Sequence, residues 1–174
     1  MKHKWLLACT MMVIFVLSGC GKTVEEQIDS GIANAENVFK ADAEETNKTI
    51  GEIKLYVPTR YNVKQSDDLN DSNNLILTKG KDQYLLFVNE HEKADSKLHY
   101  ELLKKDQTKK IIKEEIIEED EAFGFTAIVE ADEEHYELIV SSGGAKISTI
   151  TEQKKIDTKL EDMMAIVRSV QLKE

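Results

Sequence analysis

Cysteine, proline and tryptophan are scarce in this sequence. Its 174 residues include two cysteines, Cys9 and Cys20, with one proline and one tryptophan. Because no cysteine follows residue 20, disulfides, thiolate-bound zinc, iron–sulfur clusters and cysteine nucleophiles are excluded for the rest of the chain. Basic residues are also few: the sequence has 23 Lys and Arg but 33 Asp and Glu, which gives a formal net charge of −10. A nucleic-acid partner is therefore not expected, because binding it requires clustered Lys and Arg.

Long hydrophobic segments are missing too. The clearest apolar run, residues 5–17, is thirteen residues long, whereas a membrane-spanning helix needs about twenty. The run follows a short basic start at Lys2, His3 and Lys4. A basic start before a short apolar core is typical of a secretory signal peptide, which is removed from the mature protein.

The residues that end this run are Leu17-Ser18-Gly19-Cys20. They resemble the lipobox of bacterial lipoproteins. The resemblance implies cleavage before Cys20 and a thioether-linked diacylglycerol on its thiol, and two acyl chains anchor a protein stably where one does not. We therefore expect residues 1–19 to be a lipoprotein signal peptide and the remainder to be lipid-anchored at the extracytoplasmic face of the cell membrane. In the alternative, the protein is secreted and Cys20 is incidental.

Residues 22–45 have a helical pattern of apolar positions. They place one apolar stripe on a helix, with charged residues on the other side: Val24, Ile28, Ile32, Ala35, Val38 and Phe39. Residues 41–49 are polar and read as a linker, so residues 20–49 are expected to form a lipid-anchored helix and linker. The stripe favours packing on the domain, and the alternative is that it docks a partner helix.

Residues 50–174 are expected to form one globular domain. Alternating or apolar runs predict strands at 53–57, 61–64, 75–77, 84–88, 111–117, 123–129, 135–140 and 147–150. A polar loop is expected at 66–74 and a turn at residues 141–144, where glycine permits positive φ. A short helix carries Leu98, Leu102 and Leu103, and a later helix begins with a capping box at Thr158 and Glu161. This order predicts an α+β fold, a mainly antiparallel sheet flanked by helices.

Two segments of this domain resemble the PsbP-like α/β/α sandwich family. The first is Leu55-Tyr56-Val57-Pro58-Thr59-Arg60-Tyr61, although Tyr61 stands where that family often has Trp. The second is the closing passage from helix to strand, Met164-Ala165-Ile166-Val167-Arg168-Ser169-Val170. The resemblance covers roughly residues 50–172. It implies a non-catalytic binding or assembly factor, with no active site to carry over.

Carboxylates dominate residues 114–137, which contain no Lys or Arg. A weak cation site or an acidic face for a basic partner could use six of them: Glu118, Glu119, Asp120, Glu121, Asp132 and Glu133. The flanking strands are expected to bring the two ends of this set near each other. The pattern gives no cation-binding loop geometry, so a solvated edge that resists edge-to-edge pairing is favoured. Near an anionic membrane such a face is repelled.

No metal, cofactor or catalytic motif emerges from the remaining residues. His91, His99 and His135 form no ligand pair of familiar spacing. The turn at residues 141–144 lacks both the frame of a nucleophile elbow and the Lys of a phosphate loop. We therefore expect no enzyme and no cofactor, but a tethered lipoprotein that binds or supports an envelope protein. A small-ligand or cation-binding lipoprotein is the alternative, and a cell-envelope hydrolase is the weaker one.

Overall fold

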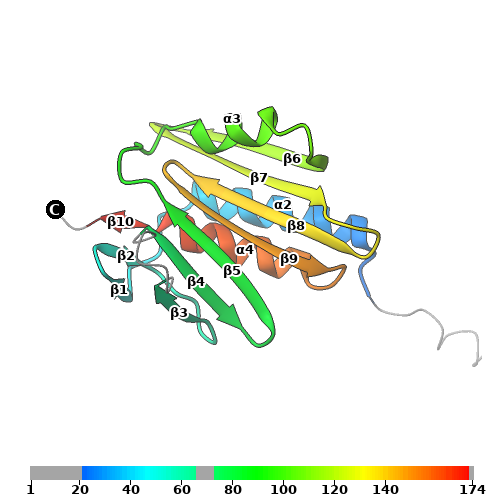
Figure 1. The fold of residues 1–174 in the computed structure, drawn as a ribbon, viewed down its shortest axis with the longest axis horizontal. Coiled ribbons are helices and arrows are strands. Elements are labelled where there is room, and N and C mark those ends of the chain that lie inside the picture. Colours follow the sequence, from blue (N-terminus) through cyan, green and yellow to red (C-terminus); the bar gives the residue numbers. More distant parts are fainter. Residues whose placement is uncertain (1–20, 66–72, 173–174) are drawn as a thin grey trace, which may run out of the picture.

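The computed structural model describes residues 21–65 and 73–172. Figure 1 shows a seven-stranded antiparallel sheet, in the order β3-β4-β5-β9-β8-β7-β6, with helices on both faces. Its strands are β3 (Asn62–Gln65), β4 (Asn74–Lys79), β5 (Asp82–Val88), β6 (Lys110–Glu119), β7 (Ala122–Glu130), β8 (His135–Ser142) and β9 (Ala145–Glu152). The expected α+β class, a mainly antiparallel sheet flanked by helices, is confirmed. Cys20 and residues 66–72 of the expected polar loop lie outside the described residues.

A second, smaller sheet joins the two ends of the domain. It has the order β1-β2-β10, with β1 (Lys48–Ile50), β2 (Ile53–Leu55) and β10 (Gln171–Leu172). The side chain of Ser169 ties this sheet to the preceding helix, because its hydroxyl accepts from the Tyr56 amide and donates to the Ile166 carbonyl. Part of the expected linker at 41–49 is therefore a strand, since β1 begins at Lys48 and pairs with β2.

Two helices cover one face of the large sheet (Figure 1). They are α2 (Val24–Lys40) and α4 (Ile156–Arg168). The predicted stripe of α2 is buried at Ile28, Ile32, Ala35 and Phe39, which share one core with α4 and the sheet. Helix α2 thus packs on the domain, and the hydrophobic core continues across the expected boundary at residue 50. The helix ends at Lys40, five residues earlier than expected.

The capping box lies on a different helix from the one expected. Thr23 Oγ1 accepts from the Glu26 amide at 3.1 Å, and Glu26 Oε2 accepts from the Thr23 amide at 2.8 Å, so this pair caps α2. The box predicted at Thr158 and Glu161 is wrong. Helix α4 starts at Ile156 after Lys155, whose φ of 58° is left-handed, and Thr158 lies within the first helical turn.

The short helix α3 (Leu98–Lys105) covers part of the opposite face of the sheet. Its residues Tyr100 and Leu103 pack on apolar side chains of β6, β7 and β8, which are Ile111, Phe123, Phe125, Ala127, Val129 and Ile139. The β4, β5 and β9 part of this face has exposed apolar residues, with Leu85 48% and Ile150 64% exposed. Within the described ranges, no helix is both long and apolar enough to cross a membrane.

Candidate functional site

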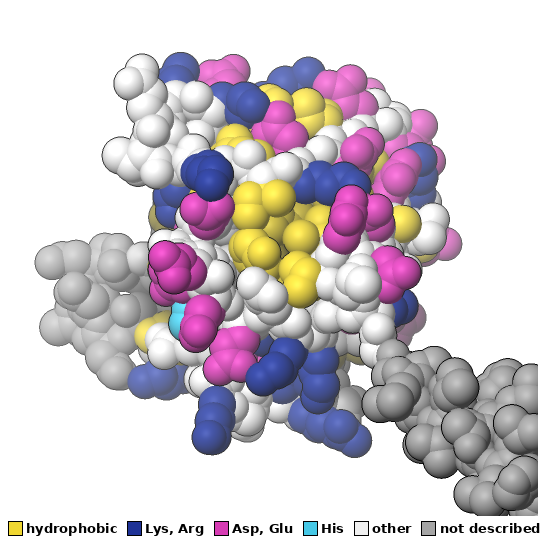
Figure 2. Space-filling model, turned by 90° about the vertical axis from the view of Figure 1, so that its right-hand side faces the viewer, with side chains coloured by type: hydrophobic (Ala, Val, Ile, Leu, Met, Phe, Trp, Pro, Cys, Tyr) yellow, Lys and Arg dark blue, Asp and Glu magenta, His cyan; other side chains and the backbone are white. Residues whose placement is uncertain are grey.

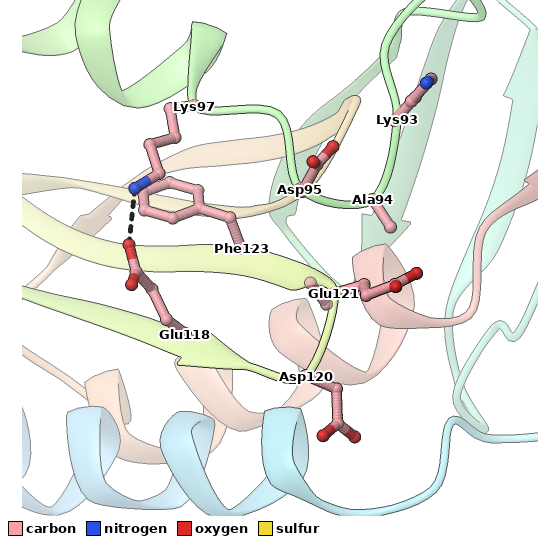
Figure 3. Close-up of a pocket in the computed structure, with 9 residues that line it drawn as sticks. Lys93, Ala94, Asp95, Lys97, Glu118, Asp120, Glu121 and Phe123 are labelled. Carbon is pink, nitrogen blue, oxygen red and sulfur yellow. Dashed lines mark hydrogen bonds and ion pairs between the residues drawn. The ribbon is translucent and has the colours of Figure 1, made fainter.

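An open cleft of about 620 Å³ lies where the loop between β5 and α3 meets the turn between β6 and β7 (Figure 3). An apolar floor and charged side chains of both signs line it: Lys93, Ala94, Asp95, Lys97, Glu118, Asp120, Glu121, Ala122 and Phe123. Three of the six predicted acidic candidates, Glu118, Asp120 and Glu121, therefore belong to this cleft. We take it as the candidate site and call it the 93–123 cleft.

Main-chain hydrogen bonds fix the upper wall of the 93–123 cleft. The Phe123 amide donates to the Ala94 carbonyl at 2.9 Å, and the Asn89 amide donates to the Gly144 carbonyl at 2.9 Å. The predicted glycine turn between β8 and β9 makes this approach possible. Gly143 has a φ of +52°, as the turn reading allows, and a Cβ on it would lie 2.7 Å from the Lys93 carbonyl oxygen. The loop can thus lie against the sheet because Gly143, directly beneath it, has no side chain.

One ion pair crosses the cleft floor. Lys97 Nζ lies 2.6 Å from Glu118 Oε1 and 5.1 Å from the centre of the Phe123 ring (Figure 3). Both charged side chains are more than half exposed, at 54% and 61%, so the pair contributes little to stability. The pair places the lysine ammonium group over the aromatic ring.

The other charged groups of the cleft do not converge on a point. Asp95, Asp120 and Glu121 point in different directions in Figure 3, and Lys93 points away from them. None of these four has an ion-pair partner among the described residues. Nor do the described residues contain a group of three or more His, Cys, Asp or Glu placed to hold a metal ion. The arrangement suits an extended contact with a surface better than the capture of one ion.

The six acidic candidates are not brought together as the sequence suggested. Glu118 to Glu121 lie at the turn between β6 and β7, whereas Asp132 and Glu133 lie at the turn between β7 and β8. Strand β7 separates the two turns by its full length, roughly 30 Å at the usual rise per residue. As an edge strand of the large sheet, β6 carries exposed charged residues, which agrees with the solvated-edge interpretation.

Several carboxylates of the same run form ion pairs with lysines. Glu114 and Glu130 lie 2.8 Å and 2.6 Å from Lys104 and Lys110, and Glu137 pairs with Lys109. Asp132 accepts hydrogen bonds from the Glu134 amide and from the His135 ring and amide, which together lower the pKa of its carboxyl group. Five carboxylates of the run are thus held in separate local pairs: Glu114, Glu118, Glu130, Asp132 and Glu137.

The three histidines have different surroundings and share no partner. His99 lies on α3 and is buried, and its Nε2–H donates to the Gly144 carbonyl at 3.1 Å. Burial lowers its pKa, more than the hydrogen bond to Gly144 raises it. His135 is bound to Asp132, which raises its pKa, and His91 is exposed beside Glu90. His99 therefore helps to hold the glycine turn that supports the 93–123 cleft.

A partly buried set of polar contacts between the sheet and α4 was not anticipated from the sequence. Lys159 is 7% exposed, and its Nζ lies 2.9 Å from Asp82 and also donates to Thr151. Nearby, Asp162 accepts from Tyr61 at 3.0 Å and from Lys79 at 2.6 Å. These partners are far apart in the chain, so no local pattern could reveal them. These contacts join α4 to the strands beside its hydrophobic core.

The fold was compared with solved structures, and the sequence with protein families and curated proteins. The solved structures include a similar one, the solution structure of cyanobacterial PsbP from Synechocystis sp. PCC 6803. It is 10% identical, the match covers 70% of this chain and 86% of that chain, and the TM-score is 0.45. No protein-family model matches the sequence, and no curated protein matches it either.

Proposed function

We propose that this protein is a lipid-anchored extracytoplasmic lipoprotein whose domain binds an envelope protein without catalysing a reaction. The lipid on Cys20 would confine the domain to two dimensions. Such confinement raises the effective concentration of a binding module near its partners without any new contact. The proposed mechanism is therefore tethering and presentation of a surface.

The observation that carries the binding proposal is the make-up of the 93–123 cleft. Its floor consists of the exposed Ala94, the half-buried Ala122 and the Phe123 ring, which is 4% exposed, and exposed charges of both signs surround it. Interfaces between proteins commonly have such an apolar centre and a polar rim. Catalytic sites instead bring a few polar groups to one point in an enclosed pocket. The divergent charges seen in Figure 3 favour the first of these two uses.

The position of the cleft also supports the proposal. The folded domain starts at Lys22, close to the Cys20 anchor, and α2 begins at the opposite end of the large sheet from the cleft (Figure 1). A cleft at the end away from the anchor can reach a protein partner without being blocked by lipid.

The anchor is tested by labelling cells that express the full chain with an alkyne analogue of palmitate. The unmodified protein and the Cys9→Ala variant should both incorporate the label and sediment with membranes. Cys20→Ala should lose the label, because the thiol that accepts diacylglycerol is gone. Cys9 is the matched control, since it is the chain's other cysteine. Equal labelling of Cys20→Ala and the unmodified protein would refute the lipid anchor.

A further inference from the structure

The folded domain begins almost directly after Cys20. Lys22 Nζ lies 2.8 Å from Asp157 of α4 and 2.9 Å from Ser30 of α2, and the Lys22 carbonyl accepts from the Gln27 side chain. Two residue steps separate Lys22 from Cys20, so at most about 7 Å of extended chain lies between them. If Cys20 carries the lipid, as proposed above, the domain has no linker on which to move away from the membrane.

The end of the domain nearest to this tether is identified by the strand register. The turn after β4, the turn after β7 and the end of β9 all lie at one end of the large sheet. Helices α2 and α4 start at the same end, where the Ile156 amide donates to the Gln27 side chain. We call this the tether end. The 93–123 cleft lies at the other end (Figure 1).

Three acidic residues beside the lysines of the tether end are neutralised by ion pairs, Glu152 with Lys154 at 3.0 Å, Asp82 with Lys159 at 2.9 Å and Asp157 with Lys22 at 2.8 Å. Lys81 follows the glycine of the turn after β4, and Lys154 and Lys155 precede α4. The ion pair between Lys159 and Asp82 joins these two segments. The acidic residues Asp132, Glu133 and Glu134 occupy the turn after β7 instead. Figure 2 looks at this end and shows basic side chains gathered along one side, with acidic ones around and above an apolar centre.

Lys81 and Lys155 are available to an external anion. Both side chains are exposed, and neither has an ion-pair partner among the described residues. The left-handed backbone of Lys155, with a φ of 58°, places it at the corner where the chain turns into α4. A lysine near an anionic membrane is attracted to it, whereas carboxylates on the same end are repelled.

We infer that the domain lies on the membrane through Lys81, Lys154 and Lys155, which contact anionic lipid headgroups. The acidic turn after β7 is tilted away from the lipid, and the 93–123 cleft faces away from the membrane. This orientation rests on the proposed anchor at Cys20. It assigns to the lysines a partner that is a lipid surface rather than a protein.

Lysine acetylation on vesicles tests the orientation. The chain from residue 20 has a single thiol, which can be coupled to a maleimide lipid in vesicles of phosphatidylcholine with or without phosphatidylglycerol. On vesicles with phosphatidylglycerol, acetylation of Lys81 and Lys155 should fall at least threefold, and 0.5 M salt should restore it because salt screens the attraction. Lys93, exposed at the far end, is the internal control and should react equally on both vesicles.

Two outcomes would overturn the orientation. One is unchanged acetylation of Lys81 and Lys155 on vesicles with phosphatidylglycerol, and the other is protection of Lys93 to the same extent. The double variant Lys81→Gln and Lys155→Gln should also remove the protection of Lys154 while leaving the melting temperature unchanged. Because the coupling is chemical, these results do not depend on lipidation in cells, and the palmitate-analogue experiment judges the anchor separately.

Discussion

Replacing Phe39 by alanine should lower the free energy of unfolding by about 3–5 kcal/mol, the usual cost of removing a buried aromatic side chain. The ring is 1% exposed and lies directly over the backbone of β7, so closely that a Cβ on Gly124 would be 2.4 Å from Phe39 Cε2. On α4, the guanidinium carbon of Arg168 lies 5.2 Å from the centre of the Phe39 ring. Phe39 thus joins α2, α4 and the sheet, and its loss leaves a cavity among all three.

Chemical denaturation of the Phe39→Ala protein measures this effect. Asn37→Ala is the matched control, because Asn37 is exposed on the same helix and its carbonyl, not its side chain, caps the end of α2. The control should change stability by less than about 0.5 kcal/mol. Unchanged stability of Phe39→Ala would mean that α2 is free to dock on another protein, the alternative that the sequence alone left open.

Replacing Gly143 by alanine should destabilise the protein and also loosen the loop over the 93–123 cleft. A left-handed backbone costs a residue with a Cβ about 1–2 kcal/mol. Gly143 has the further penalty that its Cβ would meet the Lys93 carbonyl at 2.7 Å and Ala94 Cα at 2.8 Å. Both contacts are with main-chain atoms, so the loop has to move. A combined loss of about 2–5 kcal/mol follows when overpacking of about 1–3 kcal/mol is added.

Gly80→Ala separates these two costs. Gly80 has a φ of +62°, similar to that of Gly143, yet nothing lies within 4 Å of the position of its Cβ. Its replacement should therefore show the conformational cost alone. Hydrogen exchange of the Phe123 amide, which donates to Ala94, reports on the loop. Faster exchange in Gly143→Ala than in Gly80→Ala is expected at matched stability, and equal exchange would contradict the account of how the loop is held.

Local patterns in the sequence predicted most of the elements. The apolar stripe of α2 and the strands β4 and β5 follow from spacing that neighbouring residues determine. The cap of α2 was not predicted, although Thr23 and Glu26 form a Thr-x-x-Glu pattern at the start of its apolar stripe that could have identified it. The same pattern at Thr158 was misleading, because α4 starts three residues earlier, with Lys155 rather than Thr158 at the cap position.

The candidate site depended on contacts that sequence spacing does not encode. Ala94 joins Phe123 through main-chain atoms, and Lys97 meets Glu118 across a ring. Such contacts require knowledge of which strands pair and where the loop crosses them. The expected proximity within the acidic run failed for a related reason. Consecutive antiparallel turns lie at opposite ends of the strand between them, so the candidates at residues 118–121 and 132–133 are held apart.

Crosslinking from inside the 93–123 cleft tests the central claim most directly. A photoreactive amino acid in place of Glu121 lies in the cleft, and the same amino acid in place of Lys155 lies on the tether end, both at exposed positions. In intact cells, we expect position 121 to give a reproducible protein adduct that is absent from position 155 and lost in the Cys20→Ala background. The same background of adducts from both positions, unaffected by Cys20→Ala, would contradict a tethered domain that binds its partner through this cleft.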